Sequence, residues 1–250
     1  MPKKVVATVE ARMASSRLPG KTLKLIGDKT ILEWTLQRLR MAKGIDDVIV
    51  ATTTNVSDDP IYKLCNKINT ACFRGSEEDV LNRVASAARK MGADVIVQGG
   101  ADCPFYDPDI VGQLVKIFLQ GDYDYVCNDF QEGYPIGVNI HVLSAQKLYE
   151  VEKLATLQKD RENVVTYIWD HAENYKIYNL VPPSEIKRPD IRLTVDYSED
   201  LVFLNEVYRG IGNDSFRTID IIRYLEKNKH LLELNKMCKM KKESCAYSVD

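Results

Sequence analysis

The sequence predicts an α/β fold in which a mostly parallel, Rossmann-like sheet carries helices on both faces. In the first 120 residues, short apolar runs rich in β-branched residues alternate four times with amphipathic helical segments, a pattern typical of a parallel sheet. Three polar loops, at residues 10–21, 74–79 and 99–104, each follow a predicted strand. Because ligand sites in such sheets lie beyond the carboxyl ends of the strands, we expect these loops to form one site.

The composition is that of an ordinary globular protein. The chain has 250 residues, enough for one large or two small α/β domains, and a formal net charge of -2. This charge gives no overall attraction to nucleic acid or to an anionic membrane, so any phosphate binding must be local. No apolar run approaches membrane-spanning length, and the first residues lack the apolar core of a leader peptide. We therefore expect neither nucleic acid nor membrane as a partner.

The cysteines and histidines indicate no metal centre of their own. The six cysteines contain no C-x-x-C pair, and the three histidines are scattered along the chain. A disulfide framework and a zinc site are therefore not indicated, and we expect a reduced, cytoplasmic protein.

The first half predicts strands and helices in alternation. A strand at residues 5–9 leads into the loop 10–21, and a capping box at Thr30 and Glu33 opens a helix that ends near Ala42. Continuous apolar runs then predict buried strands, and apolar residues at helical spacing predict helices. These strands lie at residues 48–53, 70–73 and 94–98, and the helices begin at residues 59, 76 and 107.

The second half breaks this alternation. Its predicted strands lie at residues 123–127, 134–142, 175–181 and 191–195, and its helices at residues 144–157 and 160–171, followed by further helix. No internal repeat, low-complexity linker or Pro/Gly-rich hinge divides the chain. We therefore expect one domain at residues 1–225 and a helical, basic tail at residues 226–250 whose end frays.

The loop from Glu10 to Lys21, with the sequence EARMASSRLPGK, has the composition of a phosphate-binding loop. Its small residues let backbone N–H groups approach an anion, and Arg12, Arg17 and Lys21 supply the charge that a triphosphate needs. We take Arg12 and Lys21 as the candidate catalytic residues. The nucleotide contacts predicted in this loop are Ala11, Arg12, Met13, Ala14, Ser15, Ser16 and Lys21.

Two other interpretations of this loop remain open, a P-loop and an ordinary basic surface loop. A dinucleotide site has no support, because the chain contains no G-x-G-x-x-G fingerprint. Residues 15–22 differ from a P-loop by Ser15 in place of the first glycine, but Pro19 lacks an N–H and Lys21 does not lead straight into a clear helix. An ordinary basic surface loop is the second alternative.

Two aspartates are candidate ligands for Mg²⁺. Asp102 lies in a glycine-rich turn after the strand 94–98, and Asp196 closes the strand 191–195. Mg²⁺ is usually held by one or two carboxylates together with phosphate oxygens and water. Either aspartate could instead cap a helix or a turn. Together with the cationic loop, they could neutralise a triphosphate, which is most of what nucleotidyl transfer requires.

Further side chains could contact the nucleotide at the next two strand ends. Arg74 and the helix start at Ser76, with Asp79 three residues on, offer donors that could read a base or hold an anion. A capped surface helix explains these three residues equally well. Gln98, at the end of its strand, is either another nucleotide contact or a simple strand-end residue.

Polar residues of the second half could bind a second substrate. Arg161, in the polar cluster at residues 160–163, could grip an acidic group, although an exposed helix N-terminus explains that cluster as well. Asn139 and His141 share one face of a strand-like segment that starts near Tyr134. These three residues could line a pocket for the acceptor.

Taken together, these segments resemble the CMP-sugar cytidylyltransferases, the family that activates 3-deoxy-octulosonate and acylneuraminates, and in particular its spore coat polysaccharide protein F branch. The resemblance rests on EARMASSRLPGK at residues 10–21, FRGSEEDVL at 73–81, ADCP at 101–104 with Asp107-Pro108, and LTVD at 193–196. It extends over the chain to about residue 225.

The resemblance implies a GT-A-like nucleotidyltransferase fold, CTP as the donor, dependence on Mg²⁺ and a homodimer. In the family, the residues that match Arg12 and Lys21 bind the triphosphate, and those that match Asp102 and Asp196 hold the metal. The segment that matches residues 74–79 approaches the cytosine and the ribose.

This chain departs from the branch at several positions. The branch commonly has Arg-Ile-Thr-Gly-Asp where this chain has Gln98-Gly-Gly-Ala-Asp102, and Gln where it has Glu10. Tyr134-Pro-Ile-Gly-Val-Asn139 replaces a more acidic pattern. The resemblance therefore indicates the nucleotide but not the acceptor.

We expect a CTP-dependent enzyme that transfers CMP to a sugar acid or to a phosphorylated or phosphonate small molecule, releases pyrophosphate and serves surface glycan biosynthesis. The alternatives are a sugar-phosphate nucleotidyltransferase, a GT-A glycosyltransferase and a non-catalytic nucleotide-binding protein.

Overall fold

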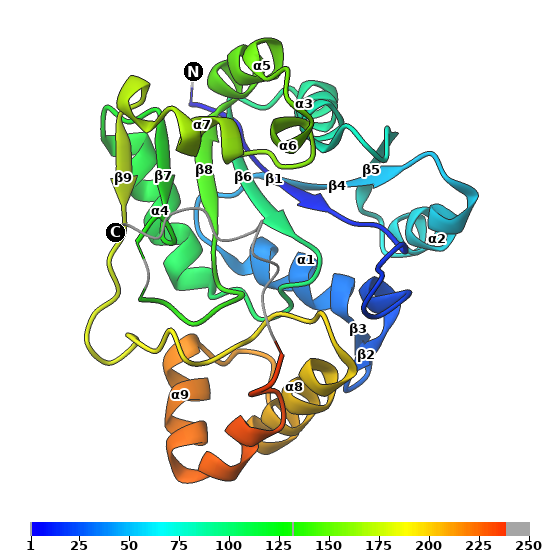
Figure 1. Ribbon diagram of the computed structural model, residues 1–250, viewed down its shortest axis with the longest axis vertical. Helices are drawn as coiled ribbons and strands as arrows, with labels where there is room; N and C mark the ends of the chain where they lie inside the picture. The colour runs from blue at the N-terminus through cyan, green and yellow to red at the C-terminus, as the bar shows by residue number, and fades with distance from the viewer. Residues whose placement is uncertain (1, 132, 239–250) are drawn as a thin grey trace.

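A seven-stranded sheet forms the centre of the protein (Figure 1). The computed structural model describes residues 2–131 and 133–238. Across the sheet, the strands are β5 (Ala71–Gly75), β4 (Asp47–Thr53), β1 (Val5–Glu10), β6 (Val95–Gly100), β8 (His141–Ser144), β7 (Tyr125–Cys127) and β9 (Ile177–Asn179). Within this sheet, β8 runs antiparallel to both neighbours, and the other adjacent pairs are parallel. The predicted fold class is confirmed.

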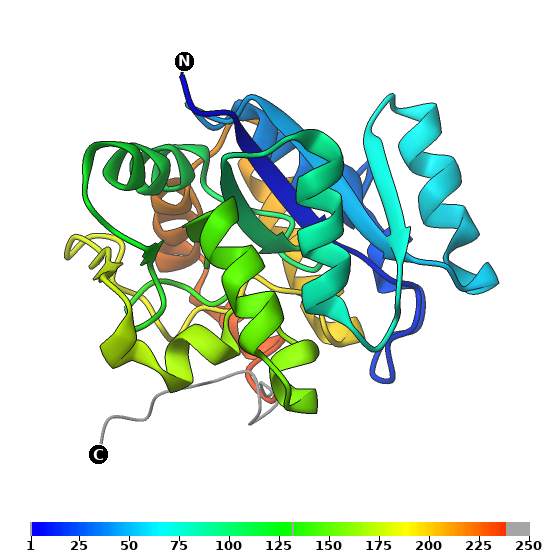
Figure 2. The same cartoon turned by 90° about the horizontal axis from the view of Figure 1, so that it is seen from above.

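Helices cover both faces of the sheet, as Figure 2 shows. They include α1 (Ile31–Met41), α2 (Asp59–Lys67), α3 (Val80–Met91), α4 (Pro108–Gln120) and α5 (Ala145–Leu154). Val5, Ala7 and Val9 of β1 pack with α1, α2 and α4, whereas Val6 packs with α3 and α5 on the other face. This alternation follows from the two-residue period of a strand, and it gives the protein two hydrophobic cores.

Two further helices, α8 (Ser198–Ile211) and α9 (Thr218–Lys227), pack beside α1 below the sheet in Figure 1. The buried Arg38 of α1 fastens this region, because its guanidinium donates to the backbone oxygens of Tyr106, Asp214 and Phe216 at 2.8, 3.0 and 2.6 Å. Burial lowers the pKa of Arg38 to about 10. Arg38 thus joins α1 to the turn before α4 and to the loop between α8 and α9.

The predicted strands 134–142 and 191–195 are largely wrong. Of the first, only the end belongs to a strand, β8, and the second forms a single bridge between Ile136 and Arg192. Pro135 lacks a donor for a sheet ladder, and Gly137 has a φ of +96° at a place where a Cβ would lie 2.6 Å from Thr194 N and 2.7 Å from Leu193 C. The chain therefore crosses itself here without forming a ladder.

Smaller differences follow from local turns. The predicted helix 160–171 is two short helices, α6 (Gln158–Arg161) and α7 (Thr166–Asp170), because Asn163 accepts from the Val165 N–H and turns the chain. The sequence analysis missed the hairpin of β2 (Leu25–Ile26) and β3 (Lys29–Thr30), which turns at Gly27.

The predicted C-terminal tail is described in part. Residues Lys229–Glu233 form a short 3-10 helix, in which Leu231 is buried, and Asn235 is buried beyond it. Residues 239–250 lie outside the described residues. None of the described helices is both long and apolar enough to cross a membrane.

Candidate active site

A cavity of about 290 Å³ opens where β1 and β6 end, as expected for ligand sites of parallel sheets. Of the predicted nucleotide contacts, six from the loop after β1 line it: Ala11, Arg12, Ala14, Ser15, Ser16 and Lys21. Met13 does not line this first cavity, because its side chain packs against the core and its N–H donates to Asp58 Oδ1 at 2.7 Å.

The loop holds its shape through its own polar groups. Gly20, in the left-handed region at φ 69°, donates its N–H to Met13 O at 3.0 Å. The Leu18 N–H donates to Ser15 Oγ at 3.3 Å, and Thr22 Oγ1 donates to Arg12 O at 3.0 Å. After Lys21 the chain makes only a three-residue 3-10 helix before β2, so the long helix that follows a P-loop is not formed.

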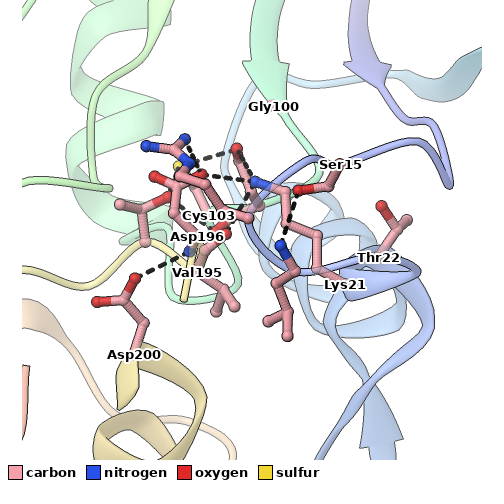
Figure 3. A network of polar contacts seen from close by, with 12 residues as sticks. Ser15, Lys21, Thr22, Gly100, Cys103, Val195, Asp196 and Asp200 are labelled. Carbon is pink, nitrogen blue, oxygen red and sulfur yellow. Dashed lines mark hydrogen bonds and ion pairs between the residues drawn. The ribbon is translucent and has the colours of Figure 1, made fainter. Parts of the chain in front are cut away.

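Lys21 pairs with both predicted metal ligands, Asp102 and Asp196, and Figure 3 shows it beside Asp196. Its Nζ donates to Asp102 Oδ2 at 2.8 Å, to Asp196 Oδ1 at 2.9 Å and to Val195 O at 2.8 Å. Burial alone would lower the pKa of Lys21, but the two carboxylates outweigh it and raise the pKa. Carboxylates 81 and 175 positions away along the chain thus meet the loop at one point.

Asp196 is the most heavily paired carboxylate of the site. Its Oδ1 also accepts from Arg17 at 2.5 Å, and its Oδ2 accepts from Arg192 at 2.6 Å. Burial would raise the pKa of Asp196, but Lys21, Arg17 and Arg192 outweigh it and hold the pKa below its ordinary value. Asp196 therefore stays ionised despite being buried.

Asp200 anchors this arrangement from below. It accepts from Arg192 Nε at 2.9 Å and from the N–H groups of Asp196 and Tyr197 at 2.9 and 3.0 Å, which caps α8. The sequence analysis did not single out Arg192 or Asp200. Both lie four residues from Asp196, and this spacing could have pointed to them. The pairing of Arg192 with Asp196 and Asp200, however, requires a turn, and the predicted strand 191–195 would not make one.

The donor set fits Mg²⁺. Asp102 and Asp196 approach closely enough to share one cation, the Lys21 ammonium, and carboxylate oxygens are ligands that Mg²⁺ prefers. No group of three or more His, Cys, Asp or Glu side chains that could hold a metal occurs among residues 2–131 and 133–238. Two carboxylates suffice where phosphate oxygens and water complete the coordination.

A second cavity of about 250 Å³ adjoins the first. The two share Arg17, Gly100, Asp102 and Asp196 in their walls. Asn139 and His141, two of the predicted acceptor contacts, line the second cavity, as does Gln98, which was predicted to contact the nucleotide. The two carboxylates therefore stand where the cavities meet.

Gln98 is joined to the first cavity through Glu10. Its Nε2 donates to Glu10 Oε1 at 2.5 Å, and Glu10 lines the first cavity. Burial raises the pKa of Glu10, although the Gln98 hydrogen bond and nearby Arg83 oppose the rise. Arg83, which the sequence analysis missed, also lines the first cavity and is almost fully buried.

Arg74, Ser76 and Asp79 line neither cavity. Arg74 donates to Thr53 O and Asn55 O, each at 2.8 Å, and pairs with a carboxylate of α2 at 2.7 Å. Ser76 Oγ accepts from the Asp79 N–H, and Asp79 in turn caps α3. In this structure the three residues shape the turn between β5 and α3.

The remaining predicted acceptor contacts also lie outside both cavities. Arg161 pairs with Asp79 and donates to Glu152 O at 2.6 Å, which ties α6 to α3 and α5. Tyr134 is buried in the core under the sheet.

Arg12 stays at the rim of the first cavity, 52% exposed and 3.8 Å from Glu77.

Sequence comparisons agree with this geometry. A family model described as cytidylyltransferase matches residues 6–242. An uncharacterised protein of Methanocaldococcus jannaschii is 34% identical over 238 residues, which cover 95% of this chain and 97% of the relative. The spore coat polysaccharide biosynthesis protein SpsF of Bacillus subtilis is 31% identical over 232 residues, which cover 90% and 95%.

Solved structures give the same result. A cytidylyltransferase from Leptospira borgpetersenii superposes with a TM-score of 0.87 at 32% identity, covering 92% of this chain and 97% of the other. A CMP:2-keto-3-deoxy-manno-octonic acid synthetase, solved in complex with CTP, has a TM-score of 0.62, covers 82% and 98%, and at 16% identity shows the fold alone. From the family match over nearly its whole length, this chain belongs to the cytidylyltransferases.

Proposed function

We propose that this protein is a Mg²⁺-dependent enzyme that transfers CMP from CTP to a small-molecule acceptor and releases pyrophosphate. The observation that carries the proposal is the pair of adjoining cavities that share Asp102, Asp196 and Arg17. Transfer between two substrates requires that they meet, and the two cavities meet where Arg17 lies beside the carboxylates of Asp102 and Asp196.

The first cavity suits the nucleotide. The loop after β1 offers backbone N–H groups and small side chains, and Arg12, Arg17 and Lys21 bring three positive charges to its wall. Positive charge and oriented N–H groups are what a triphosphate requires. The octonic acid synthetase that shares this fold was solved with CTP bound, which supports cytidine as the nucleoside.

Asp102 and Asp196 would hold the magnesium ion. A bound Mg²⁺ supplies positive charge that polarises the phosphate oxygens. Around it, Arg192 and Asp200 orient Asp196, and Lys21 offsets negative charge as it develops on the departing pyrophosphate. Positioning and charge compensation are most of what nucleotidyl transfer asks of a protein.

The second cavity suits an acceptor such as a sugar acid or a phosphorylated or phosphonate compound. Its wall combines Arg17, which can pair with an acidic group, with the polar side chains of Asn139, His141 and Thr194. The Bacillus subtilis relative is named for polysaccharide biosynthesis, which supports a role in making a surface glycan. We also propose that the protein acts as a homodimer.

The test is release of pyrophosphate from CTP by the purified protein, with Mg²⁺ and a panel of sugar acids and small phosphorylated or phosphonate acceptors. Turnover should require both an acceptor and Mg²⁺, and Lys21→Met or Asp102→Asn should lower it about 10²-fold or more. Lys116→Met, on the exposed face of α4, is the matched control and should leave turnover unchanged. Thermal stabilisation by CTP without pyrophosphate release for any acceptor would favour a non-catalytic nucleotide-binding protein.

A further inference from the structure

Met13 is the fixed point of the loop after β1. Its N–H donates to Asp58 Oδ1 at 2.7 Å, and its carbonyl oxygen accepts from the Gly20 N–H at 3.0 Å. Its side chain packs against the hydrophobic core. Residues 14–19 therefore form a span whose two ends are joined at Met13, and a shift of Met13 would carry the span with it.

The span carries donors that the protein itself does not use. Ala14, Ser15 and Ser16 line the first cavity, and no acceptor within residues 2–131 and 133–238 takes their backbone N–H groups. Three successive N–H groups of this kind are suited to an anion. Since these groups follow Met13 directly in the chain, their placement depends on how firmly Met13 is held.

The residue that holds Met13 is itself tightly fixed. Asp58 is 1% exposed and ends a short 3-10 helix, Val56–Asp58, after β4. Its Oδ2 accepts from Thr53 Oγ1, and its N–H donates to Asn55 O at 3.0 Å. A carboxylate accepts stronger hydrogen bonds than a neutral group, and this one has both oxygens engaged. Asp58 can therefore transmit the position of the β4 end to Met13.

Arg74 closes the same turn from the other side. Its guanidinium donates to Thr53 O and to Asn55 O, each at 2.8 Å. The turn that supports Asp58 is thus tied to β5 as well as to β4. These contacts form a continuous path from Arg74, which lines neither cavity, to the donors of the loop.

We propose that Asp58 is a positioning residue of the nucleotide site, which acts by holding Met13 so that the N–H groups of residues 14–16 are presented to the phosphate chain. The inference rests on the proposed function for the identity of the ligand, a nucleoside triphosphate. Donors that are placed before the ligand arrives need no further ordering when it binds, which strengthens binding. The contribution of Asp58 should therefore grow with the number of phosphates on the ligand.

A phosphate ladder tests the proposal. Calorimetric titration with CMP, CDP, CTP and inorganic triphosphate, each with Mg²⁺, gives dissociation constants without any acceptor. In Asp58→Leu, binding of CTP and of inorganic triphosphate should weaken about tenfold or more, because the loop donors lose their placement. Binding of CMP should weaken by less than about threefold, so the preference for CTP over CMP should fall.

Two milder variants follow the same path of contacts. Asp58→Asn keeps an oxygen that can accept from the Met13 N–H, and its amide N–H can donate to the Thr53 hydroxyl, so it should keep the preference for CTP to within about threefold. Thr53→Val leaves Asp58 in place but removes the hydroxyl that orients it. This variant should lower the preference about threefold, and it decides the question if Asp58→Leu does not fold.

Two controls separate positioning from a loss of stability. Arg38→Met breaks buried hydrogen bonds far from this loop and should keep the full preference for CTP over CMP. Asp122→Leu makes the same chemical change at a side chain that is 94% exposed, and it should also keep that preference. Near-UV circular dichroism confirms that each variant keeps its packed core.

The ladder also separates this inference from the proposed function, because binding is measured without turnover. A fall in the preference for CTP in Asp58→Leu, without pyrophosphate release for any acceptor, supports the positioning role and overturns the transfer reaction. If the reaction does occur, the same variant should raise KM for CTP more than it lowers kcat.

Three results would overturn the positioning role of Asp58. The first is an unchanged preference for CTP in Asp58→Leu or, where that variant does not fold, in Thr53→Val. The second is an equal weakening of CMP, CTP and inorganic triphosphate, or an equal fall in Arg38→Met, either of which indicates a purely structural role. The third is a parent protein that binds none of the four probes.

Discussion

At the scale of single residues, the site depends on how buried charges compensate each other. Lys21, with 13% of its side chain exposed, is the shared cation of Asp102 and Asp196. Removing Lys21 is costly because it takes a partner from Asp196, whose side chain is 8% exposed, and from Asp102, whose side chain is 36% exposed. Arg17 and Arg192 still pair with Asp196, so Asp102 is the carboxylate more affected by a change at Lys21.

Lys21→Met should lower the free energy of unfolding by about 2 kcal/mol at pH 7. The pKa of Asp196 is held below its ordinary value, so the stabilisation is present above about pH 4 and lost as the pH falls through the lower, folded-state pKa. The raised pKa of Lys21 keeps the stabilisation intact up to about pH 10.5. Urea unfolding should therefore show a gap between parent and variant at pH 7 that narrows as the pH falls below about 4, whereas Lys116→Met should show no gap. A gap that does not change with pH would contradict this account.

The same variant should respond more strongly to divalent cations. In Lys21→Met, Asp102 and Asp196 lose the ammonium group that they share. Mg²⁺ can then supply the missing positive charge. In thermal unfolding without nucleotide, 10 mM Mg²⁺, a concentration chosen for the assay, should raise the midpoint of Lys21→Met more than that of the parent. Asp102→Asn should show no rise in midpoint with Mg²⁺. An equal rise in the parent, Lys21→Met and Asp102→Asn would show that these carboxylates do not bind the metal.

At the scale of elements, the sequence predicts what local pattern determines. The alternation of strands and helices through α4 was predicted because each element carries its own apolar period and cap, such as the Thr30 and Glu33 capping box of α1. The segments around Ile136 and Arg192 were predicted as strands because their composition is strand-like. They form one bridge instead, because Gly137 crosses the Leu193 backbone, a contact between distant parts of the chain.

The residues of the candidate site also divide into those predicted from local sequence and those whose contacts depend on distant parts of the chain. The sequence predicts that Lys21, Asp102 and Asp196 meet, and the structure brings them together, although the strand expected to end at Asp196 is not formed. Arg74 lies on an equally suggestive loop but is engaged by the backbone oxygens of Thr53 and Asn55, partners that exist only after β4 and β5 pair. The motif therefore predicts which loop carries a residue, whereas the contacts of its side chain depend on tertiary partners.

Arg38 gives an element-scale prediction, because it fastens α1 to the segment that leads into α9. Arg38→Met keeps the apolar stem but leaves the carbonyls of Tyr106, Asp214 and Phe216 without their donor. We expect a loss of about 3 kcal/mol in the free energy of unfolding, measured with urea. The control Arg223→Met, on the exposed side of α9, should change it by less than about 0.5 kcal/mol. A loss as small as that of the control would mean that packing alone joins these elements.

At the scale of the whole molecule, the candidate active site is assembled from distant parts of the chain. The loop after β1 supplies Lys21, the turn after β6 supplies Asp102, and the segment before α8 supplies Asp196. The chain beyond α9 then returns to the base of the site, where the buried Asn235 donates to Arg192 O at 3.2 Å and to Asp200 Oδ1 at 3.1 Å. Residues beyond the predicted domain end at 225 therefore support the group that orients Asp196.

This return of the chain predicts a coupling between the C-terminal segment and the proposed metal site. Asn235→Ala removes one of the donors that fix Asp200, so Arg192 should hold Asp196 less firmly. We expect a stability loss of about 1 kcal/mol, a smaller rise in thermal midpoint with Mg²⁺ and CTP than in the parent, and a lower kcat with little change in KM for CTP, since the nucleotide loop is untouched. Lys236→Ala, an exposed neighbour paired only with Glu233, is the control. If Asn235→Ala and Lys236→Ala give the same ligand shifts and the same kcat, the C-terminal segment stabilises the fold without reaching the chemistry.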